Sequence, residues 1–194
     1  MKPALALDMD GVLADWDRGL AIAIRLDRPD MPLIPYEDRR NFHASDDYPE
    51  EEREYIKSVS RRPGFYFNLP PVPGALESVR ELEAEGRFDL IILTAPMSHH
   101  PTCAQEKVAW VQEYLGQEWV SRMTITRDKT RVRATYLIDD RPGVDGVLTP
   151  EWEHLLFTRP YNLQVKGKCR ITWDTWRDVL KSHRGTDTSP RTRW

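Results

Sequence analysis

Three short apolar runs, each leading directly into polar residues, constrain the fold of this chain most strongly. They are residues 4–7, residues 90–93 and residues 136–138. No charged side chain interrupts them, and a Gly or Pro follows each run a few residues later. A continuous apolar run predicts a strand that is buried on both faces, which is typical of a parallel sheet covered by other elements.

Helical patterns separate these predicted strands. Residues 75–85 carry apolar side chains at helical spacing and end before Gly86, and residues 106–115 repeat the same spacing. A fourth, less apolar strand is expected over residues 123–126. The resulting alternation of strands and helices predicts an α/β fold, a Rossmann-like parallel sheet flanked by helices with right-handed crossovers.

The alternation is interrupted by residues 17–69, a stretch too long for an ordinary connection between a strand and a helix. Helical patterns are expected over residues 18–26 and 49–59, and its many aromatic residues argue against disorder. We therefore expect a small helical cap, inserted after the first strand and standing over the sheet.

The expected organisation follows from that insertion. A catalytic core would comprise residues 1–16 and 70–184, and the cap would comprise residues 17–69. Residues 185–194 are rich in Thr, Ser, Pro and Arg and are predicted to form a flexible tail.

Composition narrows the functional classes. The chain has 194 residues and a formal net charge of −3, so it has no overall basic surface for a nucleic acid polymer. No apolar run approaches the roughly 20 residues that span a bilayer, so no membrane partner is expected. Two cysteines, Cys103 and Cys169, are too few for a disulfide framework or a Cys-only zinc site, and they favour the reducing cytoplasm.

The acidic residues after the predicted strands carry the chemical information. Asp8 and Asp10 follow the first strand, and Gly11 permits a sharp turn after them. Asp139 and Asp140 follow the last of the three runs. Because ligands of open parallel sheets bind beyond the carboxyl ends of the strands, we expect these four carboxylates to converge.

Converging carboxylates repel one another, and a divalent cation relieves that repulsion. With no His or Cys nearby, hard oxygen ligands point to Mg²⁺. Thr94 and Lys129 follow the two remaining predicted strands and add a hydroxyl and a positive charge. Such a set suits stabilisation of a transferring phosphoryl group, with an Asp able to act as the nucleophile.

Each of these features also has an ordinary explanation when taken alone. An Asp pair after a strand commonly forms a turn or caps a helix, and a loop lysine such as Lys129 is commonly solvated. The shared position of all four groups at the ends of predicted buried strands favours a functional site over coincidence.

Four motifs extend this interpretation to a known family. They are Asp-Met-Asp-Gly-Val-Leu-Ala-Asp at 8–15, Leu-Thr-Ala-Pro at 93–96, Thr-Arg-Asp-Lys-Thr at 126–130 and Leu-Ile-Asp-Asp-Arg-Pro at 137–142. With them the chain resembles the haloacid dehalogenase (HAD) superfamily of phosphohydrolases and, within it, the 5′(3′)-deoxyribonucleotidase family. Shorter stretches at 71–75, 106–111 and 152–158 are also similar, so the resemblance covers most of residues 4–183.

The resemblance implies Mg²⁺-dependent removal of phosphate from deoxyribonucleoside monophosphates through an aspartyl-phosphate. It implies that Asp8 is the nucleophile and that Asp10 is the acid and base, whose carbonyl also meets the metal. Asp139 would bind the metal with Asp8 and Asp10, and Asp140 would support these ligands without binding the ion directly.

Further residues take implied roles around the substrate. Thr94 and Lys129 would hold the phosphoryl oxygens, and Arg127 would help to bind the substrate. Ala95 stands where many family members have Ser, so one hydrogen bond to the phosphate or sugar is missing from the pattern. The partner implied is a small-molecule nucleotide, and the sequence leaves open whether the chain forms a homodimer.

The cap is the part least similar to the family. An aromatic pocket for the base would be formed by Trp16 and Phe42, with His43 and Phe65 as further candidates. This pocket would select the substrate. A second interpretation is therefore a phosphatase with the same chemistry that acts on another small phosphate ester. A receiver-type phosphoacceptor module and a catalytically silent binding protein are the non-enzymatic alternatives.

Overall fold

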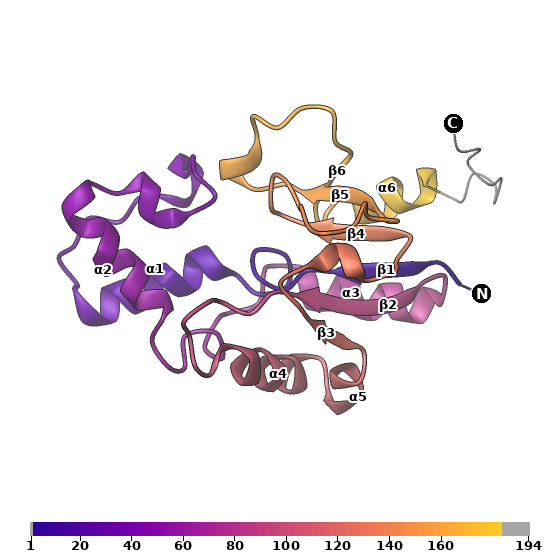
Figure 1. The fold of residues 1–194 in the computed structure, drawn as a ribbon, viewed down its shortest axis with the longest axis horizontal. Coiled ribbons are helices and arrows are strands. Elements are labelled where there is room, and N and C mark those ends of the chain that lie inside the picture. Colours follow the sequence, from indigo (N-terminus) through magenta and orange to yellow (C-terminus); the bar gives the residue numbers. More distant parts are fainter. Residues whose placement is uncertain (1, 184–194) are drawn as a thin grey trace.

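The computed structural model describes residues 2–183, so the predicted tail at 185–194 lies outside the described residues. The described chain forms a six-stranded parallel sheet with the strand order β3-β2-β1-β4-β5-β6 (Figure 1). The strands are β1 (Ala4–Leu7), β2 (Asp89–Thr94), β3 (Met123–Ile125), β4 (Tyr136–Asp139), β5 (Glu153–Phe157) and β6 (Arg170–Ile171). The α/β class predicted from the apolar runs is confirmed.

The register brings the functional strand ends to one level. Leu7 of β1 lies opposite Ile92 of β2 and Ile138 of β4. The next residue, Asp8, donates its backbone N–H to the Ile138 carbonyl over 2.9 Å. Asp8 therefore emerges from the middle of the sheet beside the carboxyl end of β4.

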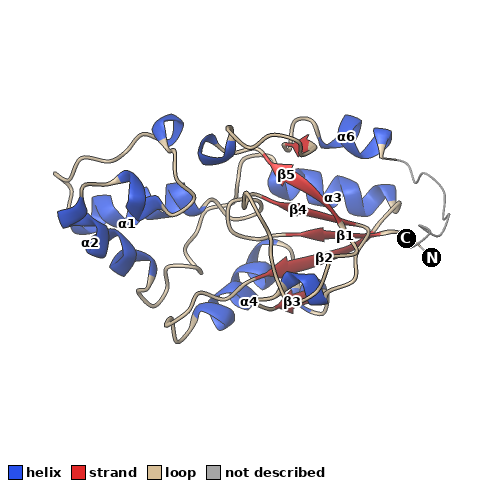
Figure 2. Cartoon of the chain, turned by 45° about the horizontal axis from the view of Figure 1, so that its top comes forward, coloured by secondary structure: helices blue, strands red, loops and turns tan. Residues whose placement is uncertain are grey.

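Both faces of the sheet are buried, which explains why its central strands are continuously apolar. On one face the side chains of Leu5, Leu7 and Ile92 pack in one cluster with helix side chains. The helices are α3 (Ala75–Glu85), α4 (Cys103–Tyr114) and α6 (Trp176–Ser182), and a short helix, α5 (Gln117–Val120), follows α4 (Figure 2). On the other face Ala6 and Trp152 belong to a second, smaller cluster.

Residues 17–69, here called the cap segment, continue from β1 and extend beyond the carboxyl end of the sheet (Figure 1). Their helices are α1 (Trp16–Asp27), η1 (Tyr36–Asp38), η2 (Ala44–Asp47) and α2 (Glu50–Ser60). Asp15 caps α1 by accepting the Arg18 N–H over 3.2 Å. The segment packs its own apolar side chains, including Leu20, Ile24 and Ile56.

The chain enters and leaves the cap segment through two adjacent connections. The Asp15 N–H donates to the Pro70 carbonyl over 2.7 Å, and the Val72 N–H donates to the Leu13 carbonyl over 2.8 Å. These paired connections tie the base of the cap segment to the turn that follows β1.

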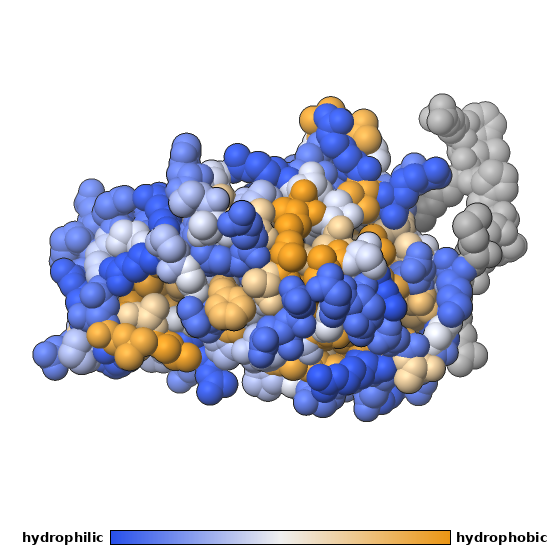
Figure 3. All heavy atoms as spheres, turned by 90° about the horizontal axis from the view of Figure 1, so that it is seen from below, coloured by the Kyte–Doolittle hydropathy of each residue, from blue (hydrophilic) through white to orange (hydrophobic). Residues whose placement is uncertain are grey.

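On the face seen in Figure 3, apolar side chains lie in separate groups among mainly hydrophilic ones. Among the described residues the most exposed large ones are Leu26 at 83%, Val147 at 73% and Leu163 at 62%, and they belong to three separate segments. Within residues 2–183, no helix combines the length and the apolar character that crossing a bilayer requires.

Candidate active site

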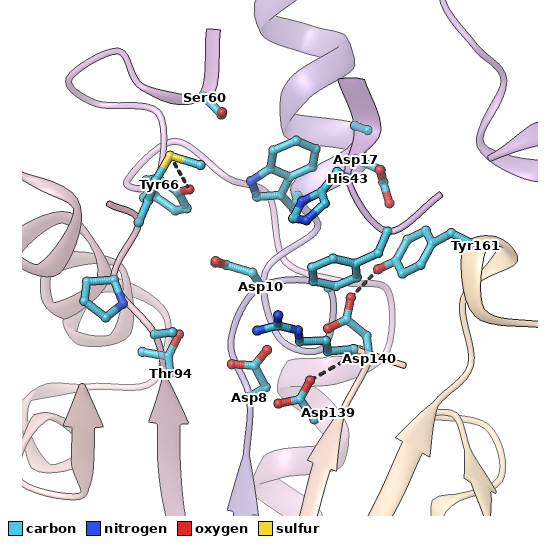
Figure 4. A pocket seen from close by; sticks show the side chains of 18 of the residues that line it. Asp8, Asp10, Asp17, His43, Ser60, Tyr66, Thr94, Asp139, Asp140 and Tyr161 are labelled. Carbon is cyan, nitrogen blue, oxygen red and sulfur yellow. Dashed lines mark hydrogen bonds between the residues drawn. The ribbon is translucent and has the colours of Figure 1, made fainter. Parts of the chain in front are cut away.

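Three carboxylates converge at the carboxyl edge of the sheet. Asp8, Asp139 and Asp140 each offer a carboxylate oxygen, and these oxygens lie within 4.8 Å of one another (Figure 4). All three residues are buried. That Asp139 binds a metal directly while Asp140 only supports it stays a prediction, because both residues offer a carboxylate oxygen equally close to that of Asp8.

Lys129 joins two of these carboxylates. It begins the short helix η3 (Lys129–Arg131), and its Nζ lies 2.7 Å from Asp8 Oδ1 and 2.6 Å from Asp139 Oδ2. Burial alone would lower the pKa of Lys129, but the two ion pairs outweigh burial and raise it. Lys129 therefore carries a fixed positive charge at the edge where the strands end.

The single positive charge of Lys129 does not neutralise the three clustered carboxylates. Burial raises the pKa of Asp8 to about 6 despite Lys129, and the charges of Asp139 and Asp10 add to the rise. Burial, followed by the charges of Asp139 and Asp8, also raises the pKa of Asp140. Ionising the full set therefore requires further positive charge, and three buried carboxylates fit a hard divalent cation.

Asp10 lies outside this cluster of carboxylates and has a separate partner. Its Oδ2 accepts a hydrogen bond from Lys107 Nζ over 2.6 Å, and the same Nζ donates to Thr94 Oγ1 over 2.8 Å. Among the described residues, Asp10 Oδ1 is a buried oxygen without a hydrogen-bond partner. One oxygen of Asp10 is thus held in place, and the other is unpaired.

Lys107 was not among the predicted site residues. It lies on α4 with none of its surface exposed, inside the stretch 106–111 that is similar to the family. A signal was present, because Lys107 precedes the buried residues Trp110 and Val111 by one helical turn. A lysine on the buried side of a helix needs a charged partner, and here that partner is Asp10.

The preceding residue on α4 holds the connection that leaves the cap segment. The carboxylate of Glu106 accepts the backbone N–H groups of Gly64 over 2.7 Å and Tyr66 over 3.0 Å. Partial burial raises the pKa of Glu106, but these bonds and one from Thr102 outweigh burial and lower it. The first turns of α4 therefore support both Asp10 and the cap connection.

A cavity of about 390 Å³ opens between the strand ends and the cap segment. The residues expected to bind substrate all line it: Trp16, Phe42, Ala95 and Arg127. His43 also lines the cavity, with its ring 5.3 Å from that of Phe42. Phe65 does not line it; its ring packs edge-on behind Trp16, with the centroids 5.7 Å apart.

The fold defines a class that includes HAD hydrolases of known structure. In this chain a carboxylate pair follows the first strand of the parallel sheet, Asp139 and Asp140 lie at the end of β4, and Thr94 and Lys129 stand at neighbouring strand ends. A HAD family hydrolase from Deinococcus radiodurans, solved with bound phosphate and sodium, has a similar fold. Its TM-score is 0.58 at 14% identity, and the match covers 93% of this chain and 96% of that one.

Sequence comparison identifies the family. The family profile described as "5' nucleotidase, deoxy (Pyrimidine), cytosolic type C protein" matches residues 2–183. The human cytosolic-type 5′(3′)-deoxyribonucleotidase is 40% identical over 188 residues, which cover 92% of this chain and 94% of that protein. The human mitochondrial 5′(3′)-deoxyribonucleotidase is 41% identical over 187 residues, with coverages of 92% and 82%. The chain belongs to the 5′(3′)-deoxyribonucleotidase family.

Proposed function

We propose that this protein is a phosphomonoesterase that removes the phosphate group from deoxyribonucleoside and ribonucleoside monophosphates. One observation carries the proposal: Asp8, Lys129, Asp139 and Asp140 meet at one sheet edge, inside a cavity lined by Trp16. The names of the human relatives support the nucleotide as substrate.

Asp8 is the proposed nucleophile. An oxygen of its carboxylate forms a bond to phosphorus while the bond between phosphorus and the nucleoside oxygen breaks, which leaves an aspartyl-phosphate. Lys129, 2.7 Å from Asp8 Oδ1, keeps positive charge beside the reacting carboxylate. Thr94 is proposed to hold a phosphoryl oxygen, because its hydroxyl oxygen already lies in the hydrogen-bonded set around Lys107.

Asp10 is the proposed acid and base. As a carboxylic acid it gives its proton to the leaving nucleoside oxygen and becomes a carboxylate. In the second step it takes a proton from water, whose oxygen attacks phosphorus and releases inorganic phosphate and free Asp8. We assign the transfer to Oδ1, because Lys107 holds Oδ2 and Oδ1 is without a partner among the described residues.

The metal is proposed to be Mg²⁺, held by the carboxylates of Asp8, Asp139 and Asp140. The Asp10 carbonyl is the further ligand that the family resemblance implies. When bound, it would supply positive charge that offsets the carboxylates and the phosphoryl oxygens. The donor chemistry supports this assignment, because three buried carboxylates without His or Cys suit a hard cation.

The cap segment, together with Trp16 directly before it, is proposed to bind the nucleoside and to cover it. Trp16 and Phe42 offer aromatic faces on which a base can stack, and Arg127 lines the same cavity from the strand side. Residues 17–69 would thus act as a substrate-covering unit on a core formed by the remaining described residues. A cytoplasmic location and a homodimer stay predictions.

A panel of phosphate esters tests the proposed function. The purified protein is assayed with Mg²⁺ against deoxyribonucleoside and ribonucleoside 5′- and 3′-monophosphates and against sugar phosphates. Release of phosphate from nucleotides at the highest kcat/KM is expected. A sugar phosphate preferred over every nucleotide would reject the substrate class, and no hydrolysis of any ester would reject the enzyme.

A further inference from the structure

Tyr161 contacts both the carboxylate cluster and the cap segment. It lies in the short helix η4 (Pro160–Asn162) after β5 and is 4% exposed. Its hydroxyl donates to Asp140 Oδ2 (Figure 4). Its ring meets that of Phe42 edge-on, with the centroids 5.9 Å apart, and the Arg39 guanidinium lies 5.2 Å from the ring centre. One side chain therefore touches the proposed metal site and two cap residues.

Side chains on both sides of Tyr161 also hold this turn in place. Asn162 Nδ2 donates to the Asp140 carbonyl over 2.8 Å. Arg159 Nε donates to the Gly11 carbonyl over 2.7 Å, and Arg159 Nη1 donates to the Tyr36 hydroxyl over 2.8 Å. The turn that carries Tyr161 is thus bonded to the two loops of the site and to the cap segment.

Arg39 is itself fixed within the cap segment. Its guanidinium pairs with Asp17 of α1, and its Nε donates to Asp47 Oδ2 over 2.6 Å. Arg39 is 4% exposed, so packing within the cap segment fixes the position of its side chain. Its contact with the Tyr161 ring therefore depends on how the cap segment is docked.

Gly11 packs directly against the pair formed by Tyr161 and Asp140. Its φ is +74°, and a Cβ at this position would overlap the Asp140 carboxylate and approach the Tyr161 hydroxyl oxygen to 3.1 Å. The absent side chain leaves room for the hydrogen bond. Gly11 and Tyr161 together therefore limit where the Asp140 carboxylate can lie.

We propose that Tyr161 is a positioning residue whose hydroxyl orients the Asp140 carboxylate for Mg²⁺ and whose ring links that orientation to the docked cap segment. The inference rests on the proposed function, because it assumes that the three clustered carboxylates hold Mg²⁺. Removal of a residue that orients a metal ligand commonly lowers metal affinity or activity by 10- to 100-fold. Because coupling between two binding sites is reciprocal, a substrate that orders the cap segment should also strengthen Mg²⁺ binding.

The first experiment removes only the hydroxyl. Mg²⁺ is titrated calorimetrically into metal-free wild-type protein and into Tyr161→Phe, without substrate. Tyr161→Phe is expected to weaken Mg²⁺ binding about 10-fold while the ring contacts and the melting temperature are retained. The control is Tyr48→Phe, which removes another buried hydroxyl, one that accepts the Ile34 N–H inside the cap segment. Wild-type Mg²⁺ affinity in Tyr161→Phe would overturn the proposal.

The second experiment tests the link to the cap segment. Phe42→Leu is made alone and combined with Tyr161→Phe, and the same titration is repeated. Phe42→Leu is expected to weaken Mg²⁺ binding about 2- to 3-fold when Tyr161 is present and to have no further effect when its hydroxyl is gone. Independent, multiplying effects of the two substitutions would contradict the link.

The outcomes separate this inference from the proposed function. A wild-type protein that hydrolyses nucleotides with Mg²⁺, together with a Tyr161→Phe variant of unchanged Mg²⁺ affinity, would reject the role of Tyr161 alone. A wild-type protein that neither binds Mg²⁺ nor hydrolyses nucleotides would reject the proposed function and this inference with it.

Discussion

The strand ends and the cap segment line one cavity but are built from different interactions. At the strand ends, charged groups from distant parts of the chain meet directly, as Lys129 does with Asp8 and Asp139. On the cap side, aromatic rings pack edge-on, as Trp16 does with Phe65 and Phe42 with Tyr161. The charged edge is suited to act on a phosphate, and the aromatic side is suited to select what carries it.

Because the two regions use different interactions, substitutions in them should change different kinetic constants. Substitutions at the strand ends should act on kcat, because they alter groups that respond to charge in the transition state. Substitutions in the cap segment should act on KM and on base preference, because they alter stacking that is present before the reaction.

The largest effect is expected for Asp8→Asn. The amide cannot form the aspartyl-phosphate, so kcat should fall by roughly 10⁴-fold or more. Asp89→Asn is the control, because Asp89 is an exposed carboxylate at the opposite end of β2. Steady-state kinetics with a deoxyribonucleoside monophosphate provide the measurement, and retained turnover in Asp8→Asn would exclude the proposed nucleophile.

The same variant should not be less stable than the wild type without metal. The folded pKa of Asp8, about 6, lies above its ordinary value of 3.8, so its contribution to stability is complete below about pH 4 and lost as the pH rises through 6. Asp8→Asn removes a charge that burial disfavours, so the variant gains stability relative to the wild type where Asp8 would be ionised. Its free energy of unfolding relative to wild type, measured in chelator, should therefore increase from acidic to neutral pH; a constant difference would contradict this.

A smaller effect on kcat is expected for Lys107→Met. The substitution keeps the buried aliphatic stem of Lys107 but removes its bonds to Asp10 and Thr94. Loss of an oriented acid and base should lower kcat by roughly 10²- to 10³-fold, with KM changing much less. Lys181→Met, on the exposed side of α6, is the matched control. An unchanged kcat would mean that Lys107 supports the fold alone.

The aromatic side of the cavity should respond through KM. Trp16→Ala removes an aromatic face from the cavity, and base stacking is worth about 1–3 kcal/mol, so KM should rise roughly 5- to 100-fold with a smaller change in kcat. Phe67→Ala is the control, because Phe67 is 42% exposed and does not line the cavity. A fall in kcat as large as the rise in KM would contradict the proposal that the strand ends act on kcat and the aromatic side acts on KM.

The smallest effect is expected for Glu106→Gln, which addresses the junction of the two regions. A neutral amide accepts the N–H groups of Gly64 and Tyr66 more weakly, so the free energy of unfolding should fall by about 1 kcal/mol near neutral pH. The pKa of Glu106 is lowered on folding, so its stabilisation is present above the ordinary value of 4.5 and is lost as the pH falls. Denaturant unfolding should show the difference shrinking below about pH 4.

Sequence reasoning succeeded where the signal was local. Helix α3 covers residues Ala75–Glu85 as predicted, because an apolar stripe ends at a glycine with a left-handed φ of +62°. The strands β1, β2, β3 and β4 were also predicted within one or two residues. Strands β5 and β6 were not, because β5 begins with Glu153 and His154 and β6 has only two residues.

The sequence by itself determined the parallel sheet and the residues that follow its strands. A strand buried on both faces needs an unbroken apolar run, and polar residues at its end are released at the sheet edge. Asp8, Thr94, Lys129 and Asp139 could therefore be named before their contacts were known.

Only the tertiary structure decided which other side chains meet these groups. Lys107 reaches Asp10 from a separate helix, and Tyr161 reaches Asp140 from a turn between β5 and β6. Such contacts depend on how whole elements pack, and no spacing along the chain encodes them. The packing of the cap segment likewise decided that Trp16 and Phe42 face the cavity while Phe65 stands behind.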